Sequence, residues 1–198
     1  MKPEALIVSP GGQLGGEINV PGDKSISHRA VMLGAIANGT TEIKGCLLGE
    51  DVRATIAAFR AMGVSIEEQD GGRLTIHGRG FAALRKPDNC LDMGNSGTSI
   101  RLLCGLLAGA EFDVTMTGDH SLQGRPMRRV TDPLLQMGAK IETSDSGTPP
   151  LSIRGRSALS AIRYTLPMAS AQVKSAVLLA ALNATGHTHV IEPVATRD

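Results

Sequence analysis

An internal repeat constrains the fold of this 198-residue chain more than any other feature of its sequence. Three blocks recur later in the same kind of context: residues 27–33 as 99–105, 61–66 as 136–141, and 74–80 as 151–157. The two members of each pair start 72, 75 or 77 residues apart. Because three separated blocks recur at similar spacing, we interpret the chain as copies of one folding unit.

Each copy follows the order strand, helix, strand, helix, strand, strand. The first copy predicts a strand at residues 17–20, a helix at 28–38, a strand at 42–47, a helix at 52–62, and strands at 64–68 and 73–78. We expect Ser25 or Ser27 to cap the first helix, and Gly39 and Gly63 to follow helix ends. The glycine pair at positions 71 and 72 predicts the turn between the last two strands.

The later copies are less complete. The second covers residues 90–155, with its second helix at 128–137, and a third copy opens at residue 163. The third contains a helix at 173–184 and a strand at 187–192, and the sequence stops at residue 198, where a second helix is due. We therefore expect the third unit to lack one helix and two strands, and the chain to be the N-terminal portion of a longer protein.

Hydrophobic patterning indicates helices inside and sheets outside. The first helix of each copy, for example residues 175–182, is apolar on nearly every face, which is typical of a buried helix. The closing strands alternate instead, with Leu74 and Ile76 against Thr75 and His77, which is typical of a sheet with one solvated face. The sequence therefore predicts a mixed α/β fold of repeated strand–helix units.

Composition argues against several classes of function. The net charge is +1, and the chain has three Phe, one Tyr and no Trp, which disfavours nucleic-acid binding through charge or base stacking. The apolar runs fall far below the ~18–20 residues of a membrane helix, and no signal-peptide pattern opens the chain. Cys46, Cys90 and Cys104 lack the spacing of a zinc site or a disulfide framework, so we expect buried thiols in a cytoplasmic protein.

The loop that enters the first helix of each copy carries hydroxyl groups and free backbone N–H groups at a helix N-terminus, a favourable place for an anion. These loops are residues 22–29, 94–101 and 169–174. Gly97 would let the backbone approach a ligand closely. Full positive charges are added by Lys24, Arg29, Arg101 and Lys174. In any one loop these residues could be simple caps and solvated charges, but three equivalent loops favour anion binding.

A further loop, residues 118–129, holds Arg125 before a proline, in a setting suited to bidentate binding of carboxylate or phosphate. Arg128 and Arg129 are explained equally well as the exposed start of a helix. His28 lies beside Arg29 at a helix start, where we expect a structural role. No histidine in the sequence pairs with a credible nucleophile.

At these loops the sequence resembles a known family. The motifs PGDKSxSHR, LDxGNSGTxxR, TGDxSLxxRPM and SAQVK, with the terminal TRD, follow the order found in 5-enolpyruvylshikimate-3-phosphate synthases and span essentially the whole chain. This resemblance implies an inside-out α/β prism, in which residues 17–198 form the N-terminal lobe and residues 1–16 belong to a second lobe. It also implies a monomeric full enzyme that is considerably longer than this chain.

The resemblance further implies an enzyme of the shikimate pathway, and hence of aromatic amino-acid biosynthesis. Such an enzyme transfers the enolpyruvyl group of phosphoenolpyruvate to the 5-hydroxyl of shikimate-3-phosphate and releases phosphate. Residues matched to shikimate-3-phosphate contacts are Lys24, Ser25, Arg29, Ser170, Gln172 and Arg197. Residues matched to the phosphoenolpyruvate site, which the inhibitor glyphosate also occupies, are Lys24, Asn95, Gly97, Arg125 and Gln172. Lys24 is the expected acid–base catalyst, its acidic partner would lie in the second lobe, and no metal or organic cofactor is implied.

Two other interpretations stay open. The sister UDP-N-acetylglucosamine enolpyruvyl transferase shares the fold, but it would carry Asn in place of Ser25 and a reactive cysteine where this chain has Asp119 and His120. The second is a non-catalytic lobe that binds shikimate-3-phosphate without turnover. In keeping with it, we expect this fragment to be inactive without its second lobe.

Overall fold

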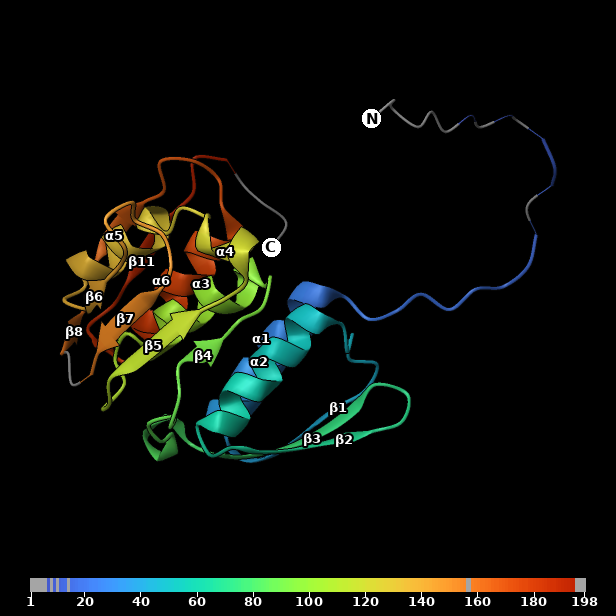
Figure 1. Cartoon of the computed structure of the whole chain (residues 1–198), viewed down its shortest axis with the longest axis horizontal. Coiled ribbons are helices and arrows are strands. Elements are labelled where there is room, and N and C mark those ends of the chain that lie inside the picture. The colour runs from blue at the N-terminus through green and yellow to red at the C-terminus, as the bar shows by residue number, and fades with distance from the viewer. Residues whose placement is uncertain (1–6, 8, 10, 14, 156–157, 195–198) are drawn as a thin grey trace.

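The computed structural model describes residues 7, 9, 11–13, 15–155 and 158–194, which form a mixture of helices and sheets (Figure 1). The first unit contains α1 (Lys24–Ile36), β1 (Asn38–Ile43), α2 (Glu50–Ala61), β2 (Ser65–Gln69), β3 (Arg73–Arg79) and the short 3₁₀ helix η1 (Phe81–Ala83). The second contains β4 (Leu91–Asp92), α3 (Gly97–Leu107), β5 (Val114–Thr117), α4 (His120–Gln123), α5 (Arg128–Gln136), β6 (Lys140–Glu142) and β7 (Leu151–Arg154). The remaining elements are β8 (Leu159–Ser160), β9 (Arg163–Thr165), α6 (Ala171–Ala181), β10 (Ala184–Thr185) and β11 (His189–Ile191).

Sheet topology repeats between the units. In the first unit β1, β3 and β2 form an antiparallel sheet in that order. In the second unit the order is β4-β5-β7-β6, in which β5, β7 and β6 are antiparallel and β4 runs parallel to β5. The third unit pairs β9 with β11 in parallel, as the second pairs β4 with β5, and β8 pairs with β10. Strands β1, β2 and β3 are thus the counterparts of β5, β6 and β7, which confirms the repeat.

The strand predicted at residues 17–20 is wrong. Residues 15–23 contain no strand, and Ile18 and Val20 are 84% and 80% exposed. Figure 1 shows this segment leaving α1 and running away from the helices and sheets. A short strand needs a paired neighbour, and among the described residues this segment has none, so four alternating residues were too weak a signal. The assignment of residues 1–16 to a second lobe stays a prediction.

The start of the first helix also differs from the prediction. α1 begins at Lys24 rather than at residue 28, because Asp23 caps it: the Asp23 carboxylate accepts a hydrogen bond from the backbone N–H of Ile26 at 2.8 Å. Ser25 and Ser27 are therefore not the N-cap. Ser27 instead donates to the Asp23 carbonyl at 2.7 Å, inside the first turn.

Strand positions in the first unit are decided by pairing. β1 begins at Asn38 rather than at residue 42, because its register against β3 starts there, and Gly39 lies inside β1 rather than after a helix end. Gly63 follows α2 with a φ of 89°, as predicted. The turn between β2 and β3 contains Gly71 and Gly72 with φ near 70°, which confirms the predicted hairpin.

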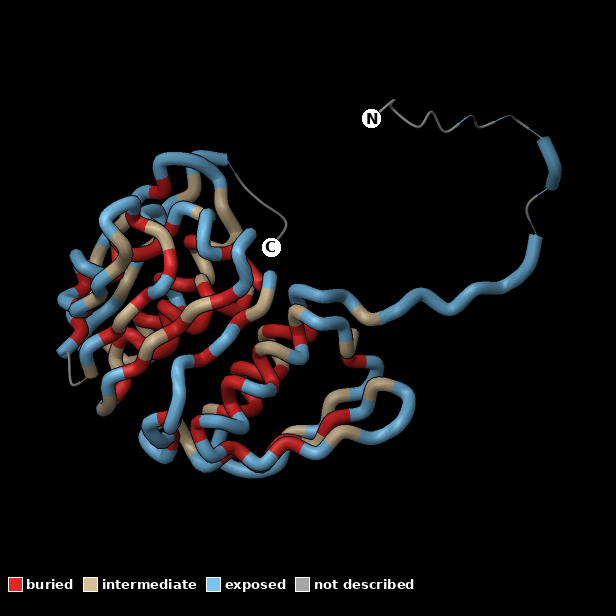
Figure 2. The backbone as a smooth tube through the Cα atoms, in the orientation of Figure 1, coloured by how far each residue is buried: buried red, intermediate tan, exposed pale blue. Residues whose placement is uncertain are grey.

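Helix α3 lies at the centre of the hydrophobic core. Nine of its eleven residues are buried, and it lies so close to α6 that any side chain at Gly105 would collide with the backbone carbonyl of Ala176. Figure 2 shows buried residues running through the helices, while strands and loops on the outside alternate with exposed positions. The prediction of a buried first helix is confirmed for α3.

Helices α1 and α6 are only partly covered. Leu33, Leu178 and Leu182 are 49%, 45% and 60% exposed and line a groove of about 240 Å³ between the two helices. The all-round apolar pattern therefore overstated their burial within this chain. The mixed α/β class is confirmed, whereas the prism description stays a prediction. Among the described residues, every helix is too short or too polar to cross a lipid bilayer.

Candidate active site

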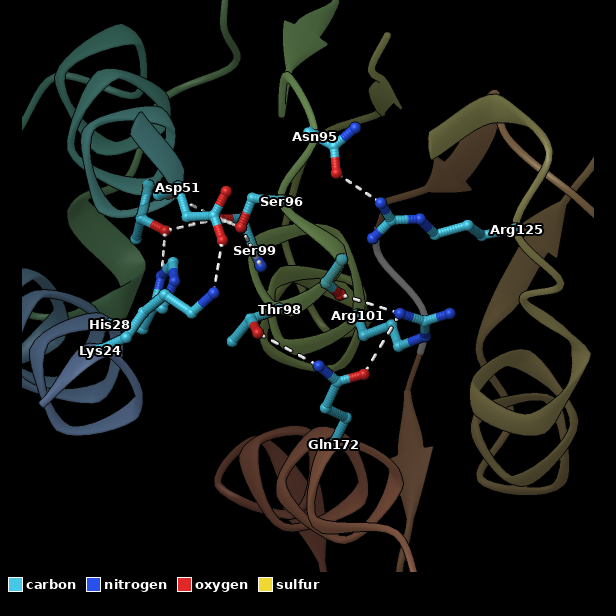
Figure 3. A network of polar contacts seen from close by, with 12 residues as sticks. Lys24, His28, Asp51, Asn95, Ser96, Thr98, Ser99, Arg101, Arg125 and Gln172 are labelled. Atoms are coloured by element: carbon cyan, nitrogen blue, oxygen red, sulfur yellow. Dashed lines mark hydrogen bonds and ion pairs between the residues drawn. The ribbon is translucent and has the colours of Figure 1, made fainter. Parts of the chain in front are cut away.

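Side chains from four helices gather around the first turn of α3 (Figure 3). The three helices that open the units, α1, α3 and α6, begin at the predicted loops, and each has a side-chain N-cap. The caps differ in charge: Asp23 on α1 is a carboxylate, whereas Ser96 on α3 and Ser170 on α6 are neutral hydroxyls. A neutral cap leaves the positive end of the helix dipole uncompensated for a ligand.

Lys24 lies in the first turn of α1 and reaches across to α2. Its Nζ is 2.9 Å from Oδ2 of Asp51, and the two side chains are 53% and 27% exposed. The ammonium group is therefore held in place by Asp51 and still accessible from solvent. Asp51 was not among the residues predicted from the sequence, although an acidic pair in the first turn of the second helix is a signal that could have found it.

Arg29 connects the first unit to the third. Its guanidinium donates to the Ser25 carbonyl at 3.1 Å and to Ser175 Oγ of α6 at 2.7 Å. The predicted Ser25 lies exposed one turn before Arg29. Lys174, also on α6, was predicted to add charge for anion binding. It forms an ion pair with Glu192 at 3.1 Å, so this carboxylate compensates its charge.

Gly97 is the point where two guanidinium groups converge. A methyl group at Gly97 would lie 2.7 Å from Nη1 of Arg101 and 2.9 Å from Nη1 of Arg125. Arg101 donates to the Gly97 carbonyl at 3.3 Å and to Oε1 of Gln172 at 3.2 Å, and Gln172 donates to Thr98 Oγ1 at 3.1 Å. The structure thus brings the predicted Gly97, Arg125 and Gln172 together, and adds Arg101 as the residue that joins them.

Arg125 is oriented by its neighbours in the adjoining loop. It donates to Asn95 Oδ1, and Asn95 in turn donates to Oδ2 of Asp119 at 2.7 Å. The Asn95 amide, followed by the backbone N–H of Leu122, holds the pKa of the Asp119 carboxyl below its usual value. Asp119 therefore accepts hydrogen bonds as a carboxylate and fixes the amide that faces Arg125.

The Asp119 carboxylate opposes the charge of Arg125 across Asn95 but forms no ion pair with it among the described residues. Within the part of the chain that the structure describes, neither Arg101 nor Arg125 has a carboxylate at ion-pair distance. Burial lowers the pKa of Arg101, and the nearby charges of Arg125 and Arg129 lower it further. Guanidinium groups gathered at a neutral-capped helix N-terminus make a strong site for a carboxylate or phosphate.

The remaining predicted contacts lie around α6. Ser170 caps this helix by accepting from the backbone N–H of Val173 at 3.4 Å, and it lines a cavity of about 260 Å³ with Arg129 and Tyr164. Arg197 lies outside the described residues. Among the described residues there is no cluster of side chains that could hold a metal ion. Cys46 and Cys104 are buried as predicted, whereas Cys90 is exposed, contrary to the prediction.

A family model described as EPSP synthase (3-phosphoshikimate 1-carboxyvinyltransferase) matches residues 8–197. This chain belongs to the EPSP synthase family. Among EPSP synthases, the 3-phosphoshikimate 1-carboxyvinyltransferases of Halorhodospira halophila and Nitrosococcus oceani are 64% and 60% identical to it, over 100% and 98% of the chain but only 45% and 44% of their own lengths. A solved EPSP synthase from Acinetobacter baumannii matches with a TM-score of 0.90 and 58% identity, over 92% of this chain and 41% of that structure. The chain thus spans less than half the length of the EPSP synthases it matches.

Proposed function

We propose that this chain forms part of an enzyme that transfers the enolpyruvyl group of phosphoenolpyruvate to the 5-hydroxyl of shikimate-3-phosphate. The observation that carries the proposal is the pair of guanidinium groups at Gly97, which have no carboxylate partner among the described residues and face the start of α3. Phosphoenolpyruvate carries a carboxylate and a phosphate, and two arginines beside a helix N-terminus suit both groups. The family relationship supports these substrates.

The chemistry needs a proton at one carbon and a hydroxyl at the next. A proton adds to the methylene carbon of phosphoenolpyruvate while the 5-hydroxyl oxygen bonds to the neighbouring carbon and loses its own proton. The tetrahedral intermediate then releases phosphate, and a proton leaves the methyl group to restore the double bond. Lys24, hydrogen-bonded to Asp51, is the proposed acid–base group.

The other residues would position two anions side by side. Arg125 and the first turn of α3 would bind phosphoenolpyruvate, with Asn95 orienting Arg125. Gln172, anchored between Arg101 and Thr98, lies between the second and third loops and would contact both substrates. Ser25, Arg29, Ser170 and Arg197 would bind shikimate-3-phosphate. Holding both reactants in one orientation supplies much of the rate enhancement available to such an enzyme.

A non-catalytic binding lobe is the second candidate, because the chain spans 45% of the length of its Halorhodospira relative. We expect this chain alone to bind shikimate-3-phosphate weakly and to form no product, since half of a closing cleft leaves ligands solvated. Product formation after addition of the remaining part of a relative would support the enzyme. Binding without turnover in that mixture would support the binding lobe.

Calorimetric titration tests the assignment of the arginine site. Arg125→Ala should weaken phosphoenolpyruvate binding by about 10- to 100-fold, the size expected when a charge-assisted contact is lost. Arg128→Ala is the matched control, because Arg128 is exposed in the same segment and lies outside the cluster at Gly97. Equal effects of the two substitutions would rule out the proposed site.

A further inference from the structure

A chain of buried hydrogen bonds links three helices directly beneath the candidate active site (Figure 3). His28 Nδ1 lies 2.8 Å from Thr55 Oγ1, and Thr55 Oγ1 lies 2.8 Å from Ser99 Oγ. Ser99 Oγ is 2.6 Å from Ser96 Oγ and 3.1 Å from the Asp51 carbonyl. The four side chains come from α1, α2 and the start of α3, and none is more than 1% exposed. We call His28, Thr55, Ser99 and Ser96 the buried relay.

The direction of the protons in the buried relay follows from counting donors. The backbone carbonyl of Asp51 can only accept, so the single hydroxyl proton of Ser99 is donated to it. Thr55 must then donate to Ser99, so its oxygen accepts from His28 Nδ1–H. His28 is therefore the neutral Nδ1–H tautomer, which agrees with an Nε2 atom that is buried without a hydrogen-bond partner.

Two members of the buried relay lie one helical turn from a group at the site, and the other two lie within two residues of Gly97. His28 follows Lys24 by four residues on α1, and Thr55 follows Asp51 by four residues on α2. Residues four apart lie on the same face of a helix. Ser96 and Ser99 flank Gly97. The buried relay thus connects the three backbone segments that carry Lys24, Asp51 and Gly97.

The repeat supplies an internal reference for what these positions need in order to pack. At offsets of 72 and 75 residues, the second unit has Ile100 where the first has His28, and Val130 where the first has Thr55. Both apolar side chains are 0% exposed. An apolar pair therefore satisfies packing at the same place in the unit, and buried polar groups generally add little net stability over apolar ones. The polar pair in the first unit calls for a role other than packing.

We propose that the buried relay is a positioning device that holds the Lys24–Asp51 pair and the Gly97 turn at the spacing required by phosphoenolpyruvate. This inference rests on the proposed function and adds His28 and Thr55 as positioning residues. Hydrogen bonds fix a distance between helices more narrowly than apolar contacts, which tolerate sliding. Without the buried relay, α1 and α2 would still pack against α3, but the distance between Lys24 and Gly97 would no longer be fixed.

The test replaces Thr55 with the residue that its counterpart in the second unit carries. Thr55→Val keeps the shape and removes both hydrogen bonds, and we expect it to weaken phosphoenolpyruvate binding about tenfold. Thr131→Val is the matched control, because Thr131 is also a buried threonine but lies on α5 outside the buried relay. Thr55→Ser keeps the hydroxyl and should bind phosphoenolpyruvate as the wild type does. His28→Asn, which keeps a donor near the Nδ1 position, should bind phosphoenolpyruvate better than His28→Leu.

Two ligand-free readouts separate this inference from the proposed function. Nitrogen NMR of the imidazole should show His28 as the Nδ1–H tautomer, and exchange of the Ser99 amide proton should accelerate in Thr55→Val but not in Thr131→Val. If the wild-type chain, mixed with the remaining part of a relative, binds no phosphoenolpyruvate, the proposed site fails, and these readouts still decide whether the buried relay holds the α3 turn. An Nε2–H tautomer, or equal effects of Thr55→Val and Thr131→Val on folded protein, would overturn the inference.

Discussion

The loops that open α1 and α3 occupy the same place in the repeat but differ in the charge of the side chain that caps the helix. α1 is capped by the Asp23 carboxylate, and α3 by the Ser96 hydroxyl. A carboxylate at the N-cap already compensates the helix dipole, whereas a hydroxyl satisfies the backbone N–H without adding charge. The first loop must therefore rely on long cationic side chains, and the second can also use its backbone.

The arginines at matching positions show how far the two loops remain alike. Arg29 donates to the carbonyl of Ser25, and Arg101 donates to the carbonyl of Gly97, four residues earlier in each case. Each arginine also contacts α6, at Ser175 and at Gln172. Duplication thus preserved the backbone and the arginine, while the cap and the residue after it set the chemistry of each loop.

The largest expected effect comes from removing the charge on which the first loop depends. In a full-length form, Lys24→Met should lower kcat by roughly 10²- to 10⁴-fold, because a general acid–base is lost. Lys24→Arg should also be poor, since a guanidinium does not readily release a proton. Steady-state kinetics with circular dichroism as a folding control would check this. Normal turnover by a folded Lys24→Met variant would remove Lys24 from the mechanism.

The second test crowds the other loop. Gly97→Ala places a methyl group against the Arg101 and Arg125 guanidiniums, so both arginines must shift while the helix backbone stays unstrained. Ligand binding should weaken by roughly 10- to 200-fold, and glyphosate binding should weaken more than phosphoenolpyruvate binding. Gly124→Ala is the control, because its methyl group would meet only ordinary contacts. Unchanged inhibition by glyphosate in a full-length Gly97→Ala enzyme would place Gly97 outside the site.

The third test uses His28, which has the apolar Ile100 as its counterpart in the second unit. The pKa of His28 is lowered from 6.5 to about 4, mainly by burial; the charge of Asp51 opposes this shift, and the charges of Lys24 and Arg29 contribute to it. The unfolded chain binds this proton below pH 6.5 and the folded chain does not, so this contribution to stability is complete above pH 6.5 and is lost progressively towards pH 4. The loss should be on the order of 3 kcal/mol. Denaturant unfolding at several pH values should show a flatter pH dependence for His28→Asn than for wild type.

The smallest expected effect comes from giving the first loop the cap of the second. Asp23→Ser keeps a side-chain cap and removes a negative charge from the N-terminus of α1. Phosphate binding near Lys24 should strengthen by about two- to fivefold, in line with helix-dipole effects of 0.3–1 kcal/mol. Asp23→Ala removes the cap as well and should destabilise the fold by about 1 kcal/mol. Tighter phosphate binding by Asp23→Ala than by Asp23→Ser would show that the hydroxyl cap contributes nothing to the site.

Local features of this protein could be read from its sequence. The repeat follows from comparing distant blocks of the sequence. The helices α2 and α6, the glycine hairpin between β2 and β3, and the polar loops before α1, α3 and α6 follow from neighbouring residues. Gly97 and Arg125 were predicted from their motifs, and the structure brings them together. These predictions succeeded because helix periodicity, turn conformation and helix-end chemistry depend on short stretches of chain.

Only the tertiary structure decided which side chains meet. Asp51 pairs with Lys24, Arg101 joins Gly97 to Gln172, and His28 reaches Thr55, and each contact spans 27 residues or more of sequence except that of Arg101 with Gly97. Tertiary structure also decided that residues 17–20 form no strand, because they have no strand to pair with among the described residues. The hydrophobic pattern of the sequence indicates the face on which a residue lies. Only the packing of separate elements decides the distance between helices, the pairing of strands and the direction of hydrogen bonds.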